Sequence, residues 1–354
     1  MQHFKGSFIF TLVCLVLSAI WEYYNSSGNI NAILSGVFIA CILGILEVSL
    51  SFDNAVVNAA VLETMEPIWQ KRFLTWGILI AVFGMRVVFP IIIVSFVAWL
   101  DPISVLKMAL TTPDIYSEHL TKSHAVISSF GGMFLLMVFL KFIMDEEKEI
   151  HWIKGLEEKL SSLGKLESFE ILIAMLILLL GAYISPEHEK ASVLISGLAG
   201  LITYISIDGL SSYLEGTEEK MLADGVKKGG IAMFIYLEVL DASFSFDGVI
   251  GAFAITKDIV IIALGLGIGA MFVRSLTLFL VKKGTLQEYI YLEHGAHYAI
   301  GLLAVIMIAS IKYHIPEVFT GLSGVLFIVV SLISSISYNK KQLEKEKVET
   351  ISAD

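Results

Sequence analysis

The stretch Glu47-Val-Ser-Leu-Ser-Phe-Asp53 places two carboxylates and two serines inside a long apolar run. Almost the same pattern returns at Asp241-Ala-Ser-Phe-Ser-Phe-Asp247. The two stretches share the pattern acid-x-Ser-x-Ser-Phe-Asp and align without a gap. A polar motif that recurs in apolar surroundings indicates an internal repeat with a buried charged site.

The composition requires lipid as the solvent for most of the chain. Of the 354 residues, 56% are hydrophobic and 16% are charged, whereas about 25% are charged in a typical soluble domain. The net charge of −10 and the lack of a basic patch argue against nucleic acid as a partner. Two cysteines, Cys14 and Cys41, exclude a disulfide framework and a thiolate metal cage.

Apolar runs near membrane-spanning length follow one another along the chain. Most reach the ~20 residues that a helix needs to cross the bilayer core. The first run resembles the core of a signal peptide but lacks a clean cleavage site, so we expect it to stay as a membrane helix. We therefore predict an all-α, polytopic transmembrane helix bundle of about ten helices. The runs are 8–21, 33–62, 73–100, 124–144, 168–184, 191–214, 231–255, 259–281, 294–313 and 318–338.

Further landmarks repeat in the same order as the acidic motifs. Arg86 and Arg274 each lie in the next apolar run, and His124 and His294 each open the run after that. Five runs per copy is an odd number, so the second copy must be inverted relative to the first, as in many secondary transporters. We predict a first repeat at 1–184, an inverted second repeat at 185–338 and a charged cytoplasmic tail at 339–354.

The basic residues of the loops predict the orientation. Loops on the side of the N-terminus hold 16 Lys and Arg residues and those on the other side hold 5, and basic loops are retained in the cytoplasm. We expect a multi-pass protein of the bacterial inner membrane with both termini cytoplasmic. In the cytoplasmic loop 145–167, apolar residues at helical spacing predict an amphipathic helix, either on the membrane surface or as a solvated connector.

The inversion would arrange the acids as a ladder across the membrane. Glu47 and Asp241 lie near the middle of their runs, Asp53 is closer to the cytoplasm and Asp247 to the outside. An ionised carboxylate facing lipid costs about 3 kcal/mol, so these acids must face one another, water, arginine or a cation. Auxiliary and purely structural roles both remain open for Asp208 and Glu238.

The candidate ligands are oxygen atoms only, which favours hard divalent cations such as Mn²⁺, Mg²⁺ or Ca²⁺, although a proton or Na⁺ could use the same groups. We expect Arg86 and Arg274 to balance the acids when no metal is bound. The candidate metal ligands are Glu47, Asp53, Asn54, Asp241 and Asp247. The supporting residues are Ser49, Ser51, Asn58, Arg86, Ser243, Ser245 and Arg274.

The segments "LEVSLSFDNAVVNAAVL" and "FDGVIGAFAIT", with an arginine in each following run, resemble the TerC family of bacterial integral membrane proteins. The resemblance is closest to a divergent branch formerly of unknown function. It implies tellurite resistance, Mn²⁺ efflux or the supply of Mn²⁺ to secreted metalloenzymes, with the five candidate ligands handling the metal. The chain has Gly248-Val-Ile where the family usually has Ser-Ile-Pro after the second aspartate.

We therefore predict a transporter that exports divalent cations, most simply Mn²⁺, by alternating access, with the metal as cargo and no fixed cofactor. An enzyme is not expected, because the Gly-x-Gly-Asp setting of intramembrane aspartate dyads is absent. One alternative is a membrane scaffold or metalation factor that docks secreted metalloenzymes or secretion machinery through its cytoplasmic loops. Another is a tellurite-resistance-related protein without transport activity.

Overall fold

The computed structural model describes residues 4–146, 148, 150–164, 166, 168–221, 230–313 and 315–353. Within these ranges it does not describe the side chains of residues 74, 78, 211–221, 246, 247, 250, 254, 285, 317, 318, 343 and 345–353.

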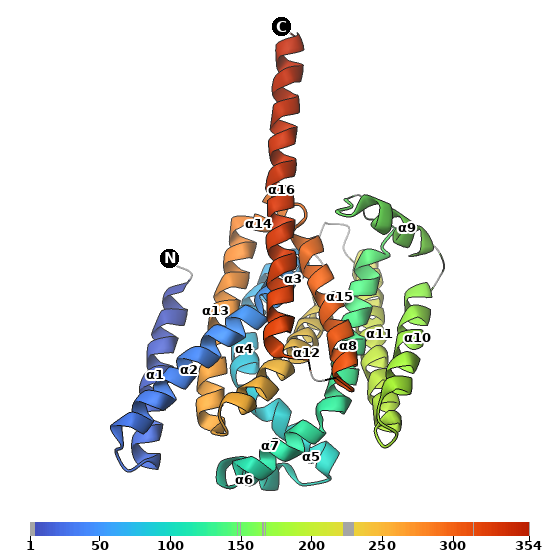
Figure 1. Ribbon diagram of the computed structural model, residues 1–354. Coiled ribbons are helices and arrows are strands. Elements are labelled where there is room, and N and C mark those ends of the chain that lie inside the picture. Colours follow the sequence, from blue (N-terminus) through green and yellow to red (C-terminus); the bar gives the residue numbers. More distant parts are fainter. Residues whose placement is uncertain are drawn as a thin grey trace.

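The described chain is all-helical and contains no strand, which confirms the predicted fold class (Figure 1). The helices are α1 (Lys5–Asn25), α2 (Ile30–Leu50), α3 (Phe52–Thr64), α4 (Pro67–Leu79), the π-helix η2 (Ile80–Val88), α5 (Phe89–Ala98), α6 (Pro102–Thr111), α7 (Pro113–Lys122), α8 (His124–Ile143), α9 (Lys154–Gly164), α10 (Phe169–Ile184), α11 (Lys190–Met221), α12 (Ile231–Ile255), α13 (Ile259–Lys283), α14 (Thr285–Glu288), α15 (Leu292–Ser310) and α16 (Glu317–Ala353).

Every predicted apolar run becomes helix. Among the described residues, 8 helices are long and apolar enough to cross a membrane, or 9 if the bent pair α9 and α10 counts as one span. Two predicted runs are not among the eight. α10 has only 16 residues, and α12 has 25 but contains three acids. The chain is therefore a polytopic helical membrane protein.

The first motif is interrupted and the second is not. Helix α2 ends at Leu50 and α3 begins at Phe52, so Ser51 breaks the first run inside its acidic motif. Helix α12 continues unbroken past Gly248 and Gly251. These two glycines do not interrupt α12, because a glycine surrounded by other helices can stay helical at a cost of ~1 kcal/mol.

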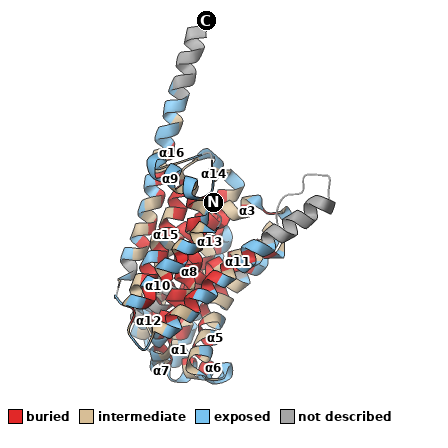
Figure 2. Ribbon diagram, turned by 90° about the vertical axis from the view of Figure 1, so that its right-hand side faces the viewer, coloured by how far each residue is buried: buried red, intermediate tan, exposed pale blue. Residues whose placement is uncertain are grey.

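Figures 1 and 2 show that both chain ends, α9 and α14 lie toward one end of the bundle, with α6 and α7 at the opposite end. The outward faces of α1, α10 and α16 expose many large apolar side chains, and Figure 2 shows the exposed face of α10. Such faces are expected for helices whose neighbours are lipid chains.

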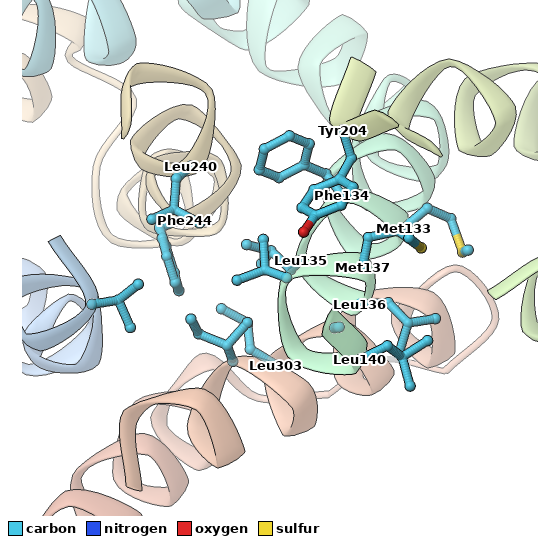
Figure 3. Packing of buried hydrophobic residues seen from close by; sticks show 14 of the residues in the cluster. Met133, Phe134, Leu135, Leu136, Met137, Leu140, Tyr204, Leu240, Phe244 and Leu303 are labelled. Carbon is cyan, nitrogen blue, oxygen red and sulfur yellow. The ribbon is translucent and has the colours of Figure 1, made fainter. Parts of the chain in front are cut away.

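The core lies where α8 meets α12 and α15. Figure 3 shows Leu135 of α8 pointing toward Phe244 of α12 and Leu303 of α15. Glycine permits the close approach of α8 and α15, because a Cβ on Gly131 would lie 2.9 Å from Cε of Met307. Lipid chains are as apolar as these side chains, so moving the side chains from lipid to a helix contact gains little hydrophobic free energy. Tight van der Waals packing of this kind is therefore what holds the helices together.

In the centre of the bundle, helices of each half of the chain pack on helices of the other half. Helix α2, which carries Glu47, packs on α13, which carries Arg274. Helix α12, which carries Asp241, packs on η2, which carries Arg86. Likewise α3 packs on α15 and α12 packs on α8. The peripheral helices do not follow this reciprocity, since α1 covers α2 and α13 whereas α11 covers α8.

Candidate functional site

The acidic motif of the first half surrounds a buried ion pair. Glu47 is 1% exposed and pairs through Oε1 with Nη2 of Arg86, which is 4% exposed. Ser51 donates its hydroxyl hydrogen to the same carboxylate oxygen over 3.2 Å. A buried pair of this kind needs extra hydrogen bonds to offset desolvation, and the break at Ser51 supplies one.

Two glycines of the second half make room for Glu47. A Cβ on Gly269 would lie 2.6 Å from Cγ of Glu47 and 2.7 Å from the carbonyl oxygen of Gly44. A Cβ on Gly248 would lie 2.8 Å from Oε2 of Glu47. The carboxylate is therefore pressed between α12 and α13, and its second oxygen faces Gly248.

A hydrogen bond joins the two acidic motifs directly. Nδ2 of Asn54 donates to Oδ1 of Asp241 over 2.6 Å, and both side chains are buried. Oδ1 of Asn54 and Oδ1 of Asn58 find no hydrogen-bond partner among the described residues. Buried amide oxygens are normally satisfied, so these two are free to accept a ligand.

These groups line one small cavity. Its volume is about 20 Å³, which is enough for roughly one water molecule or one small ion. The lining polar residues come from both halves of the chain. They are Ser51, Asn54, Asn58, Arg86, Asp241, Arg274 and Thr277.

The side chains of the two arginines that line this cavity are held by different contacts. Nη1 of Arg86 donates to the carbonyl oxygen of Ala81 within the π-helix η2, a rare helix type that often marks functional sites. The guanidinium of Arg274 lies 4.2 Å above the ring of Phe73. Its Nε and Nη2 atoms have no hydrogen-bond partner among the described residues.

Glu238 approaches Arg274 at Gly77 of α4. A Cβ on Gly77 would lie 2.8 Å from Oε1 of Glu238 and 3.1 Å from both terminal nitrogens of Arg274. In the described structure neither carboxylate oxygen of Glu238 has a hydrogen-bond partner. A third acid therefore lies close to the second arginine.

Asp53 faces a second cavity, also of about 20 Å³, which Gly248 and Thr320 help to line. A Cβ on Gly324 of α16 would lie 3.3 Å from Oδ2 of Asp53. Helix α16 thus takes part in the site, which sequence reasoning missed because its run contains no acid. Thr277 was missed too, although it lies three residues after Arg274 and so on the same helix face.

Some predicted residues lie elsewhere. Ser49 is exposed, donates to the carbonyl oxygen of Ile45 over 2.9 Å and lines an apolar groove with Cys41. Ser243 is buried and donates within its own helix to Val239 over 2.9 Å. Ser245 is buried in the same helix. The side chain of Asp247 lies outside the described residues.

In the described part of the chain, no group of three or more His, Cys, Asp or Glu residues is placed to hold a metal ion. A cation in the central cavity would therefore use a mixed set of carboxylate, amide and hydroxyl oxygens. Hard divalent cations accept such sets, whereas soft metals ask for sulfur or imidazole.

The chain matches the sequence profile of a family described as "Protein of unknown function (DUF475)" over residues 52–342. It is 29% identical over 141 residues to the "Uncharacterized membrane protein YceF" of Bacillus subtilis (strain 168), a match that covers 37% of this chain and 51% of that protein. The chain thus spans about half the length of this curated relative. No solved structure matches the chain.

Proposed function

Because this chain belongs to the family described as "Protein of unknown function (DUF475)", we propose a function from its own buried site: transport of divalent metal cations, with Mn²⁺ exported by alternating access. The observation that carries the proposal is the central cavity. Within a polytopic helical bundle, the carboxylate of Asp241 and two unpartnered amide oxygens line a space that fits one small ion.

The burial of these groups supports a cationic cargo. Asp241 is 9% exposed and Asn54, its hydrogen-bond partner, is buried as well, so protein oxygens must replace most of the water around a bound ion. A divalent cation such as Mn²⁺ takes about six oxygen ligands. The cavity-lining residues Asp241, Asn54, Asn58, Ser51 and Thr277 can supply oxygen ligands. Glu47, the hydrogen-bond partner of Ser51, can supply another, with water for any remaining position.

The arginines explain how the site tolerates the absence of cargo. Arg86 neutralises Glu47 through their ion pair, and Arg274 lies in the same cavity as Asp241. Each arginine holds the place of a cation, so Glu47 and Asp241 each keep a compensating charge nearby when no cargo is bound. Cargo entering from one side displaces the guanidinium of Arg86, and its departure lets the arginine return.

The reciprocal packing of the halves suits alternating access. The helices that carry the acidic motifs, α2 and α12, each pack on the helix of the other half that carries the arginine, α13 and η2 respectively. This packing is expected for inverted repeats that rock about a shared midplane site. We infer that the Asp53 cavity is the approach from the cytoplasm and that Asp247 guards the outer approach. The basic loops support a cytoplasmic position for both termini.

The choice of Mn²⁺ rests on the resemblance of the two motifs to the TerC family. The ligand chemistry alone admits Mg²⁺ and Ca²⁺ as well. The glycine at position 248 leaves room for the second carboxylate oxygen of Glu47, because a side chain there would approach it closely. This space allows the site to accept a broader range of divalent metal ions.

Transport by purified protein in liposomes tests the proposal. Vesicles holding a Mn²⁺-quenched dye should report Mn²⁺ movement with the wild type and lose most of it with Glu47→Gln or Asp241→Asn. Ser49→Ala is the matched control, because Ser49 lies outside the site and should keep full activity, whereas Ser51→Ala should reduce it. If vesicles with the protein are no more permeable to Mn²⁺ than protein-free vesicles, under a proton gradient of either direction, the transport proposal is wrong.

Metal binding measured on the same detergent-purified samples separates the alternatives. Binding that needs Asp241, without transport, would favour a metalation factor or scaffold. Neither binding nor transport of any divalent cation would remove the metal proposal as a whole.

A further inference from the structure

Helix α9 presents three different surfaces around its circumference. Glu157 is fully buried against the bundle. Roughly a quarter turn away, by the 100° per residue of an α-helix, the side chains of Leu156 and Leu163 form an exposed apolar stripe, which the exposed Ile153 directly before the helix extends. The remaining sector carries exposed polar residues, among them Lys159 and Glu158. An ordinary solvated connector would not expose this stripe.

The buried surface is fixed by a carboxylate anchor. Glu157 receives hydrogen bonds from the backbone N–H groups of Trp152 and Ile153 over 3.2 and 3.1 Å. The hydroxyl of Tyr298 donates to it over 3.1 Å, and Nζ of Lys148 lies 3.2 Å away. Because Tyr298 belongs to α15, this anchor ties α9 to a bundle helix that itself packs on α3.

A second contact strengthens the anchor on α15. Nε2 of His294 lies 2.9 Å from the carbonyl oxygen of Ile150 and 3.5 Å from Oε2 of Glu157. The ring of Trp152 meets that of Tyr298 edge-on at 5.6 Å. The segment before α9 and the helix itself are therefore held at two points along α15.

The position of α9 indicates what covers its apolar stripe. The helix is bent by 104° relative to α10, so it lies across the end of a span rather than along it (Figure 1). The outward face of α10 exposes Leu172, Leu176 and Leu179, which places it against lipid. Helix α9 contacts α10 and lies at the end of the bundle that holds both chain termini (Figure 1).

We propose that α9 is an interfacial helix whose stripe of Ile153, Leu156 and Leu163 is buried in the lipid leaflet, and that Glu157 fixes this helix to α15. The surface with Glu157 then faces the bundle, the apolar stripe faces the lipid, and the polar sector faces water. Lys154 and Lys159, both exposed, lie within reach of anionic headgroups. The leaflet on the α9 side thereby gains a direct mechanical connection to the helix that supports α3.

Spin labels on single cysteines test the lipid contact in proteoliposomes. The background is Cys14→Ala with Cys41→Ala, and labels are placed by Leu156→Cys and by Glu158→Cys as the matched control. The Leu156→Cys label should be relaxed more by oxygen than by a water-soluble nickel chelate, at a depth of about 5–10 Å below the headgroups. The Glu158→Cys label should show the reverse. A water-exposed Leu156→Cys label, or one shielded from both reagents, would overturn the proposal, the latter pointing to a protein contact.

The anchor has its own test in the same background. Glu157→Ala should increase the mobility of the label at Leu156→Cys, whereas Glu158→Ala should leave it unchanged. Equal mobility in both variants would show that Glu157 does not hold the helix. If the cysteine-free background fails to fold, a photo-crosslinking residue at position 156 in the native-cysteine chain gives a second measurement, with lipid adducts expected at 156 and none at 158.

Discussion

Substitution of Gly269 by alanine tests whether α13 presses Glu47 into place. The new Cβ would lie 2.6 Å from Cγ of Glu47 and 2.7 Å from the Gly44 carbonyl oxygen, whereas ordinary contact begins at 3.4 Å. The carbonyl oxygen belongs to the backbone of α2, so the two helices must separate by several tenths of an ångström. Overpacking of this kind costs about 1–3 kcal/mol.

Gly267→Ala is the matched control in the same helix. Its Cβ would meet Cγ1 of Val82 at 3.2 Å, a side-chain contact that can relax. Alanine also gains about 1 kcal/mol of helix propensity over glycine. We therefore expect Gly267→Ala to be neutral or slightly stabilising and Gly269→Ala to be destabilised by about 2 kcal/mol.

The assay is thermal unfolding of both variants in detergent, followed by Mn²⁺ binding at a temperature where both are folded. A loss of about 2 kcal/mol should lower the apparent Tm of a chain of this length by about 3 °C. Displacement of Glu47 from Arg86 should also weaken Mn²⁺ binding about tenfold, which corresponds to ~1.4 kcal/mol. Indistinguishable Tm and affinity for the two variants would refute the packing argument.

Three further predictions concern charge. Arg86→Gln should impair transport more than expression, and Arg86→Lys should rescue poorly because lysine lacks the planar fork; transport at the wild-type rate would contradict the placeholder role. In a double-mutant cycle of Glu47→Gln and Asp241→Asn, binding losses should be strongly non-additive because both acids serve one ion, and additive losses would mean two sites. Burial raises the pKa of Glu157, but backbone hydrogen bonds and the charge of Lys148 outweigh it and hold the pKa below the usual 4.5. The anchor's stability is therefore fully present above pH 4.5 and lost as the pH falls through this lowered pKa, so circular dichroism or label mobility at α9 should change only in acid.

The sequence by itself determined the helical membrane class, because apolar run length and charge depletion are imposed by the bilayer on any chain that crosses it. It also singled out Glu47, Arg86 and Asp241 as site candidates, since buried charge in lipid is too costly to lack a partner, and the structure buries all three. These inferences depend on local composition and spacing, which a sequence states directly.

Only the tertiary structure decided which side of each helix faces the site. Ser49 and Ser51 are only two residues apart, yet Ser49 is exposed while Ser51, at the break between α2 and α3, is buried. Packing of α1 and α13 against α2 decides this difference. The same holds for Glu157, which spacing assigns to a polar surface and which α15 instead buries. A helix in lipid has no single apolar stripe to fix its rotation, so contacts with neighbouring helices fix it.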